Sequence, residues 1–81
     1  NEKFSEVTIS PNPVKDFLSI SLKDQVTSIG LIDVNGTKIE IDFKAISDQK
    51  YQANLALLPS GIYFLELVSK DKVQRMKIFK N

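Results

Sequence analysis

Apolar and polar side chains alternate along most of the chain, and this alternation predicts β-strands. Leu18, Ile20 and Leu22 alternate with serines, which is typical of a strand with one buried face. Val7 and Ile9 alternate with polar neighbours in the same way. No segment repeats apolar residues at the spacing of three and four that an amphipathic helix requires. The pattern therefore predicts an all-β protein.

In the middle of the chain, the dense apolar run over residues 29–34 predicts a central strand covered on both faces. Asn35-Gly36 follows directly and predicts a type I′ hairpin turn. The alternation over residues 39–43 predicts the return strand of that hairpin. The mostly polar stretch 44–50 predicts a loop.

The C-terminal half predicts a strand over 51–55, a turn over 57–61, and a hairpin formed by 62–69 and 73–79. About seven short strands separated by turn residues favour an antiparallel β-sandwich, with a small open barrel as the alternative. Alternate positions on successive strands are expected in the core: Val7, Ile9, Leu18, Ile20, Ile29, Leu31, Ile39, Ile41, Tyr63, Leu65, Leu67, Met76 and Ile78.

Composition narrows the class of function. The 81 residues suffice for one small domain. The chain contains no His and no Cys, which excludes imidazole bases, thiolate nucleophiles and zinc sites built on these ligands. The net charge is +1 and Arg75 is the only arginine, which argues against nucleic-acid binding. No apolar run is long enough to span a membrane. We expect a binding or structural module that is not an enzyme and has no metal or cofactor.

Three polar motifs have structural explanations. The segment Asp33–Gly36 begins like a calcium loop but lacks the distal bidentate carboxylate, so the turn is favoured. Glu40 and Asp42 are expected on a solvated face. Basic residues on the last hairpin are expected to protect an exposed sheet edge from aggregation. They are Lys70, Lys72, Lys77, Lys80 and Arg75.

Four segments, in this order along the chain, resemble the C-terminal sorting domain of the type IX (Por) secretion system of Bacteroidetes. They are Ser10–Asp16 with its Pro-Asn-Pro motif, Ile29–Gly36, Leu58–Tyr63 and the basic-apolar tail Lys77–Asn81. Together they span nearly the whole chain. The resemblance implies an immunoglobulin-like sandwich of about seven strands.

The resemblance also implies a function. Such a domain directs a passenger protein through the outer-membrane type IX translocon, and a sortase-like peptidase commonly removes it. The protein is then in the periplasm during transit and finally at the cell surface or outside the cell. Residues 1–81 would be the C-terminal end of a larger secreted precursor, which agrees with an Asn at position 1. The recognition residues implied by the resemblance are Pro11, Asn12, Pro13, Gly61, Tyr63, Lys77 and Lys80.

Without the resemblance, the residues indicate only a small β-sandwich with a binding or adaptor role. The hairpin over 61–79 offers a terminal strand to which a receptor strand can pair, and edge strands also allow self-association. The alternative function is an immunoglobulin-like adhesion or carbohydrate-binding module, which would need a platform of exposed aromatic side chains.

Overall fold

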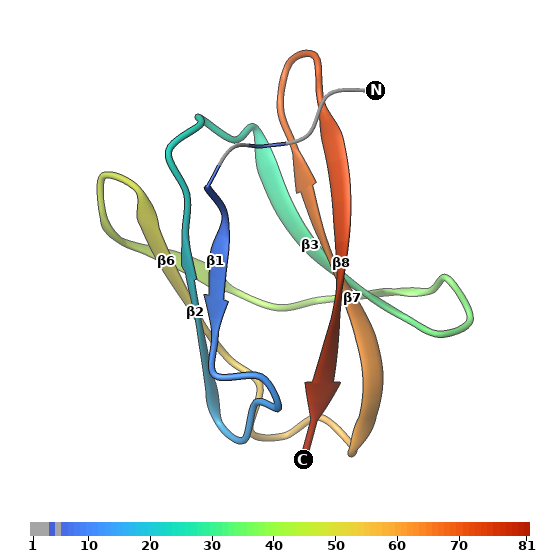
Figure 1. Cartoon of the computed structure of the whole chain (residues 1–81). Helices are drawn as coiled ribbons and strands as arrows, with labels where there is room; N and C mark the ends of the chain where they lie inside the picture. The colour runs from blue at the N-terminus through green and yellow to red at the C-terminus, as the bar shows by residue number, and fades with distance from the viewer. Residues whose placement is uncertain (1–3, 5) are drawn as a thin grey trace.

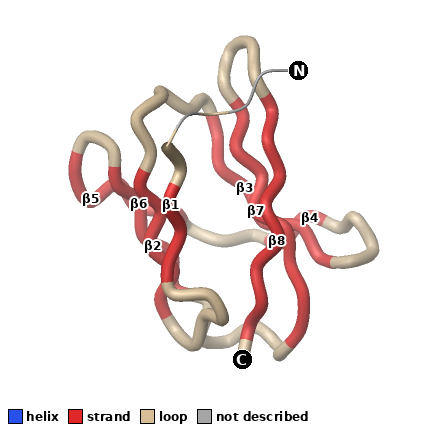
Figure 2. Tube along the Cα trace, viewed as in Figure 1, coloured by secondary structure: helices blue, strands red, loops and turns tan. Residues whose placement is uncertain are grey.

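The chain folds into two four-stranded antiparallel sheets that enclose one core, so the predicted β-sandwich is confirmed (Figures 1 and 2). The structure, a computed structural model, describes residue 4 and residues 6–81. Its strands are β1 (Thr8–Ser10), β2 (Phe17–Ser21), β3 (Ser28–Asp33), β4 (Lys38–Ile39), β5 (Phe43–Ser47), β6 (Lys50–Asn54), β7 (Gly61–Val68) and β8 (Val73–Lys80). Within the described ranges there is no helix long and apolar enough to cross a lipid bilayer.

The first sheet has the strand order β1-β2-β6-β5, and the alternation in β2 determines its buried face. Leu18 and Ile20 are fully buried, whereas Ser19 between them is exposed. Successive side chains of a strand point to opposite faces, so a shift of one residue would bury the serine instead. On the neighbouring strand β6, Ala53 lies opposite Leu18 and Tyr51 lies opposite Ile20.

The second sheet has the strand order β4-β3-β7-β8. Its longest strands, β7 and β8, form a hairpin that runs from Gly61 opposite Lys80 back to the turn between them. In β3 the consecutive residues Leu31 and Ile32 are only 1% and 4% exposed, although they point to opposite faces. Both side chains are therefore shielded from solvent at this point, although Ile32 lies on the outer face and does not belong to the core cluster between the sheets.

Most of the predicted core lies between the two sheets. The predicted residues that are buried are Leu18, Ile20, Leu31, Tyr63, Leu65, Leu67 and Ile78. Those that are partly buried and pack against this cluster are Val7, Ile9, Ile29, Ile39, Ile41 and Met76. The prediction left out Phe4, Val14, Leu22, Ala53 and Leu55, which belong to the same buried cluster. Phe4 and Val14 stand outside any alternating run, whereas Leu22, Ala53 and Leu55 continue the alternation of β2 and β6.

The middle of the chain differs from the prediction, and the described residues form eight strands rather than about seven. Only Lys38–Ile39 pairs with β3, after which the chain crosses to the first sheet and pairs there as β5 with β6. The continuous return strand over 39–43 and the loop over 44–50 are therefore wrong. The apolar side chains on both sides of the crossing pack against the same core, so their alternation does not reveal where the chain changes sheets.

The turn at Asn35-Gly36 exists but is not of type I′. The N–H of Gly36 donates to the carbonyl of Asp33 at 3.0 Å, which makes Asn35 the second central residue of the turn. Type I′ requires positive φ at both central residues, and among the described residues Glu6 is the only non-glycine with positive φ. The Oδ1 of Asp33 accepts hydrogen bonds from the N–H groups of Asn35 and Thr37, each at 2.9 Å. Gly36, with φ of 85°, then supplies the left-handed residue of a longer hairpin loop.

Candidate recognition site at the C-terminal end of the sandwich

The segment Pro11–Val14 leaves the first sheet and attaches to the last strand of the second. The N–H of Val14 donates to the carbonyl of Phe79 at 2.7 Å, and the N–H of Asn81 donates to the carbonyl of Val14 at 2.9 Å. These bonds form a parallel bridge between Val14 and Lys80. The side chain of Val14 is fully buried, so apolar contact holds the same point. The proline-rich segment therefore lies against the C-terminal tail.

Asn12 contacts this tail through its side chain. Its Oδ1 accepts a hydrogen bond from the N–H of Phe79 at 3.0 Å, across 67 residues of sequence. The peptide bonds that precede Pro11 and Pro13 are both cis, and neither proline has an N–H to offer. The side-chain oxygen of Asn12 accepts the hydrogen bond that a backbone carbonyl of a neighbouring strand would otherwise accept. The Pro-Asn-Pro motif thus covers the outer edge of β8 at Phe79.

Gly61 and Tyr63 begin β7 beside the same tail. Gly61 pairs with Lys80, and Tyr63 pairs with Ile78. The φ of Gly61 is 151°, a conformation that residues with a side chain rarely adopt. Tyr63 is buried, and its hydroxyl donates to the carbonyl of Pro59 at 2.7 Å. That hydrogen bond fixes the turn that leads into β7.

The two lysines of the predicted motif have different environments. Lys77 is exposed, and its ammonium lies 5.9 Å from the centroid of the Phe79 ring. Lys80 points inward and is only 7% exposed, with its Nζ donating to the carbonyl oxygen of Asn81 at 2.8 Å. The expectation that Lys80 is exposed at the sheet edge and protects it from aggregation is therefore wrong. Alternation along β8 places Lys80 on the same face as the core residue Ile78.

Two other basic residues of the last hairpin form ion pairs. Lys72 lies 2.9 Å from Asp24, and both side chains are about one fifth exposed. The Nε of Arg75 lies 3.0 Å from a carboxylate oxygen of Glu66. Within the described part of the chain Lys77 forms no ion pair. Lys77 is therefore the motif residue whose positive charge is offered to solvent.

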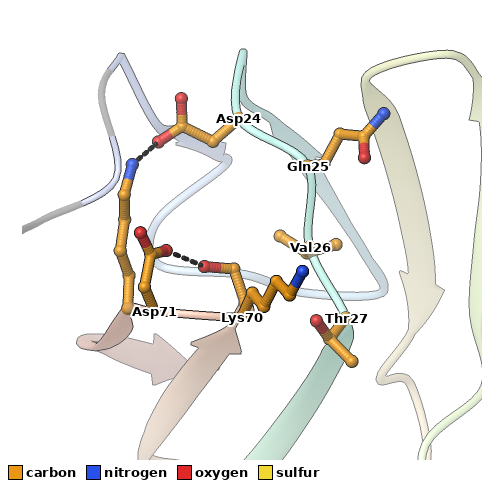
Figure 3. A pocket seen from close by; sticks show the side chains of 8 residues that line it. Asp24, Gln25, Val26, Thr27, Lys70 and Asp71 are labelled. Carbon is orange, nitrogen blue, oxygen red and sulfur yellow. Dashed lines mark hydrogen bonds and ion pairs between the residues drawn. The ribbon is translucent and has the colours of Figure 1, made fainter.

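A polar hollow of about 440 Å³ lies at the other end of the sandwich, between the β2–β3 connection and the β7–β8 turn (Figure 3). Residues 24–27 and 69–72 line it. Its polar groups bind one another: the hydroxyl of Ser69 donates to Asp71 at 3.3 Å, and the Lys72–Asp24 ion pair spans one side. None of the predicted recognition residues lines this hollow. The hollow and the predicted site are therefore separate features.

The remaining polar motifs do not join the predicted site. Asp33 uses its carboxylate to hold the β3–β4 turn. Glu40 and Asp42 are exposed, as expected, but they lie in the connection that crosses between the sheets rather than on a strand. Among the described residues no three His, Cys, Asp or Glu side chains are grouped so that they could hold a metal ion.

Sequence reasoning missed the two residues that join the site together, Val14 and Phe79. Val14 follows two prolines and has no alternating apolar neighbour, so no local pattern marks it as buried. Phe79 lies at an outward position of the last strand, where an aromatic residue is unusual, and this is the one signal that singles it out. The partner of each is distant in sequence.

The fold is a small β-sandwich in which three segments distant in sequence meet at one end. Residues 8–81 match the family model described as the secretion system C-terminal sorting domain, so this chain belongs to the type IX secretion C-terminal sorting domains. In the comparison with curated proteins, no individual protein matches the chain.

Membership in this family establishes the coarse function. The domain is a C-terminal sorting signal for type IX secretion, and it interacts with the machinery of that system. A protein that carries it is exported to the cell surface or the extracellular space. The family consists of sorting signals and is not a family of enzymes.

Proposed function

We propose that this domain directs a passenger protein from the periplasm through the outer-membrane type IX translocon, and that a sortase-like peptidase then removes it. In this reaction the domain is part of the substrate and has no catalytic role of its own. It forms the C-terminal end of a larger exported precursor. The family match over residues 8–81 supports the sorting step, and removal by a peptidase is what the resemblance to this family implies.

The observation that carries the proposal is the meeting of the predicted recognition residues at one end of the sandwich. The bond between Val14 and Phe79 joins the proline motif to the tail, and the pairing of Gly61 with Lys80 joins the tail to the start of β7. Asn12 is exposed on this surface. In an unfolded chain these segments lie far apart, so a receptor that reads this surface selects folded domains.

The outer edge of β8 supports strand addition as the mode of recognition. The backbone N–H and C=O of Phe79 point away from β7, toward Asn12 and Val14. In an antiparallel ladder alternate residues point the same way, so the backbones of Lys77 and Arg75 also point to this edge. β8 is the last strand of its sheet, and among the described residues no other strand pairs with this part of it. A receptor strand would find hydrogen-bonding groups there.

We infer that the sandwich is of the immunoglobulin-like type. The strand orders β1-β2-β6-β5 and β4-β3-β7-β8 correspond to A-B-E-D and to C-F-G preceded by one extra edge strand. A tyrosine near the start of strand F that bonds back to the preceding corner is a hallmark of such domains. The hydrogen bond from Tyr63 at the start of β7 to Pro59 supports the same inference.

The adhesion or carbohydrate-binding alternative receives less support. Its requirement is a shared platform of exposed aromatic rings. Among the described residues, Phe17 and Phe79 are the exposed aromatic side chains, and they lie in different sheets. Tyr63 is buried and Tyr51 is partly buried. We therefore retain the sorting function.

A reporter fusion tests the proposal. The domain is attached to the C-terminus of a reporter protein in a bacterium with a functional type IX system, and surface reporter is measured on intact cells with antibody and external protease. We expect the complete domain to deliver the reporter to the surface. Deletion of Lys77–Asn81 should leave the reporter in the periplasm.

The control separates loss of the signal from loss of folding. The deletion also removes Ile78 from the core, which costs roughly 2–4 kcal/mol. Ile78→Ala removes the same core contact but keeps the tail backbone and Lys77, and urea unfolding gives the folded fraction of each variant. If the deletion variant delivers the reporter to the surface at the normal level, the proposal is contradicted. It is also contradicted if delivery is proportional to the folded fraction in the same way in both variants.

A further inference from the structure

The outer face of the second sheet carries an apolar cluster that does not belong to the core between the sheets. Its members, here called the outer patch, are Ile32, Ile62, Phe64 and Phe79. Phe64 lies opposite Ile32 on β3, and Ile62 lies opposite Phe79 on β8. Ile62 and Phe79 remain 38% and 44% exposed. Adjacent large apolar side chains that stay accessible on a sheet face are typical of a contact surface.

Lysines border the outer patch on both sides. One row across the sheet takes a residue from each strand and reads Lys38, Ile32, Phe64 and Lys77. Within the described residues neither lysine forms an ion pair. In the row beyond, Glu66 is bound to Arg75, so its carboxylate does not offset the lysines. The surface is therefore apolar in the centre and positive at both edges.

We propose that the outer patch binds a protein partner whose contact surface is apolar and carries carboxylates that meet Lys38 and Lys77. The inference rests on the proposed function, since the partner is the receptor of the export machinery, and it identifies the face and the chemistry that this receptor reads. Opposite charges at both edges add attraction and orient the partner, whereas like charges are costly at an interface.

The same electrostatics argue against two other occupants. In a second copy of this domain packed with its strands aligned to the first, the lysines at the edges of the two patches would face one another, which is unfavourable. A lipid surface is also a poor match, because an interfacial element buries its apolar face several ångströms deep among headgroups. The outer patch lies on a sheet and not on an amphipathic helix, and its two lysines fall short of the clusters that bind anionic lipid.

The outer face of the first sheet provides a matched control. Phe17 and Ile46 are 51% and 57% exposed, which makes them at least as accessible as the outer patch. They do not form a comparable cluster, because Phe17 lies opposite Asn54 and Ile46 lies on the edge strand β5. Lys44 and Lys50 are exposed lysines of the same sheet. Each substitution in the outer patch therefore has an equivalent that does not touch it.

The first test uses the reporter fusion with the double variants Ile62→Thr/Phe79→Thr and Phe17→Thr/Ile46→Thr. Threonine is β-branched and suits a strand. Because truncation of central interface residues commonly costs about tenfold or more in affinity, we expect surface delivery to fall about tenfold in the outer-patch variant. Delivery should stay near the wild-type level in the control, and thermal unfolding should show that both variants are folded.

The second test concerns charge. Lys38→Glu/Lys77→Glu should lower delivery, whereas Lys38→Arg/Lys77→Arg should preserve it, because arginine keeps the charge. Lys44→Glu/Lys50→Glu changes the net charge by the same amount on the other sheet and should have little effect. Equal losses in the two glutamate variants would show an effect of overall charge and would overturn the proposal.

The results separate this inference from the proposed function. Failure of the unaltered domain to deliver the reporter contradicts the sorting function itself. If Ile62→Thr/Phe79→Thr delivers the reporter normally while the variant without Lys77–Asn81 leaves it in the periplasm, only the proposed role of the outer patch is refuted. Two binding measurements on the isolated domain address the other occupants. The domain is tested for sedimentation with phosphatidylglycerol vesicles and for a dimer in analytical ultracentrifugation. If either form of binding occurs and is lost in Ile62→Thr/Phe79→Thr, the outer patch binds lipid or a second copy, and the proposal is overturned.

Discussion

At position 61 the chain requires a backbone conformation rather than a particular side chain. Gly61 has φ of 151°, and a Cβ atom placed on it would meet no atom within 4 Å. The cost of another residue there is therefore conformational and not a steric clash with neighbours. Gly30 also has open space around its Cβ position but no positive φ. The two glycines differ in the one property that makes glycine necessary.

Gly61→Val should lower the free energy of unfolding by about 1–3 kcal/mol, because a β-branched residue is strained at this φ. In a domain of this size each kcal/mol corresponds to a fall of about 4–8 °C in the melting temperature. Gly61→Ala and Gly30→Ala form the matched pair, since each adds only a Cβ. Alanine should destabilise position 61 and leave position 30 equal or slightly more stable. Unchanged melting of both Gly61 variants would refute the argument.

At the scale of one element, β8 has an outer edge that is covered at its end and open before it. Asn12 and Val14 bind the backbone of Phe79, whereas the backbone of Lys77 points to the same edge without a pairing strand among the described residues. Ile78 lies between them and points its backbone at Tyr63 of β7. The edge available for strand addition therefore ends where the Pro-Asn-Pro segment begins.

Hydrogen exchange measured by NMR tests this division of the edge. We expect the amide of Lys77 to exchange rapidly, and the amides of Ile78 and Phe79 to be protected. Asn12→Ala removes the acceptor of the Phe79 amide and should accelerate its exchange by about fivefold, since one such hydrogen bond contributes about 1 kcal/mol. Ile78 is the internal control and should stay protected. Equal protection of Lys77 and Phe79 in the unaltered domain would contradict the assignment.

At the scale of the whole molecule, the beginning of the chain holds the last strand at both of its ends. Near the β7–β8 turn, Phe4 is buried, and its N–H donates to the side chain of Gln74 at 2.8 Å. The ammonium of Lys72 lies 5.6 Å from the ring of Phe4. At the other end Val14 forms its bridge to Lys80. Because these contacts tie the two sheets together, we expect the sandwich to unfold as one unit.

Each sheet contains one tyrosine, and the chain has no tryptophan, so fluorescence can report on each sheet separately. Tyr51→Phe leaves Tyr63 as the reporter for the second sheet, and Tyr63→Phe leaves Tyr51 for the first. In each variant the urea transition seen by fluorescence should coincide with the one seen by circular dichroism. Tyr63→Phe loses the hydrogen bond from the tyrosine hydroxyl to the carbonyl of Pro59, so this variant should be less stable by about 0.5–1.5 kcal/mol. Separate midpoints within one variant would show that the sheets unfold independently.

The sequence by itself determined the all-β class, most strands and most of the core. Alternation is a local property, and it decides which side chains of a strand share a face without reference to any distant residue. Leu18, Ile20, Leu65 and Leu67 were identified in this way and are all fully buried. The family was also recognisable, because its motifs keep their order along the chain, and the family match agrees. The roles of the individual recognition residues stay predictions.

Only the tertiary structure decided which distant segments meet. The attachment of Val14 to β8 depends on hydrogen bonds between residues at opposite ends of the chain, and no local pattern specifies such a pair. The crossing between β4 and β5 was hidden because both sheets bury their apolar side chains in the same core. The prediction of an exposed Lys80 is wrong because the charge of the side chain says nothing of its inward position in the alternation. Burial, pairing and the assembly of the site are properties of residues brought together in space, and the order of residues along a chain records them only in part.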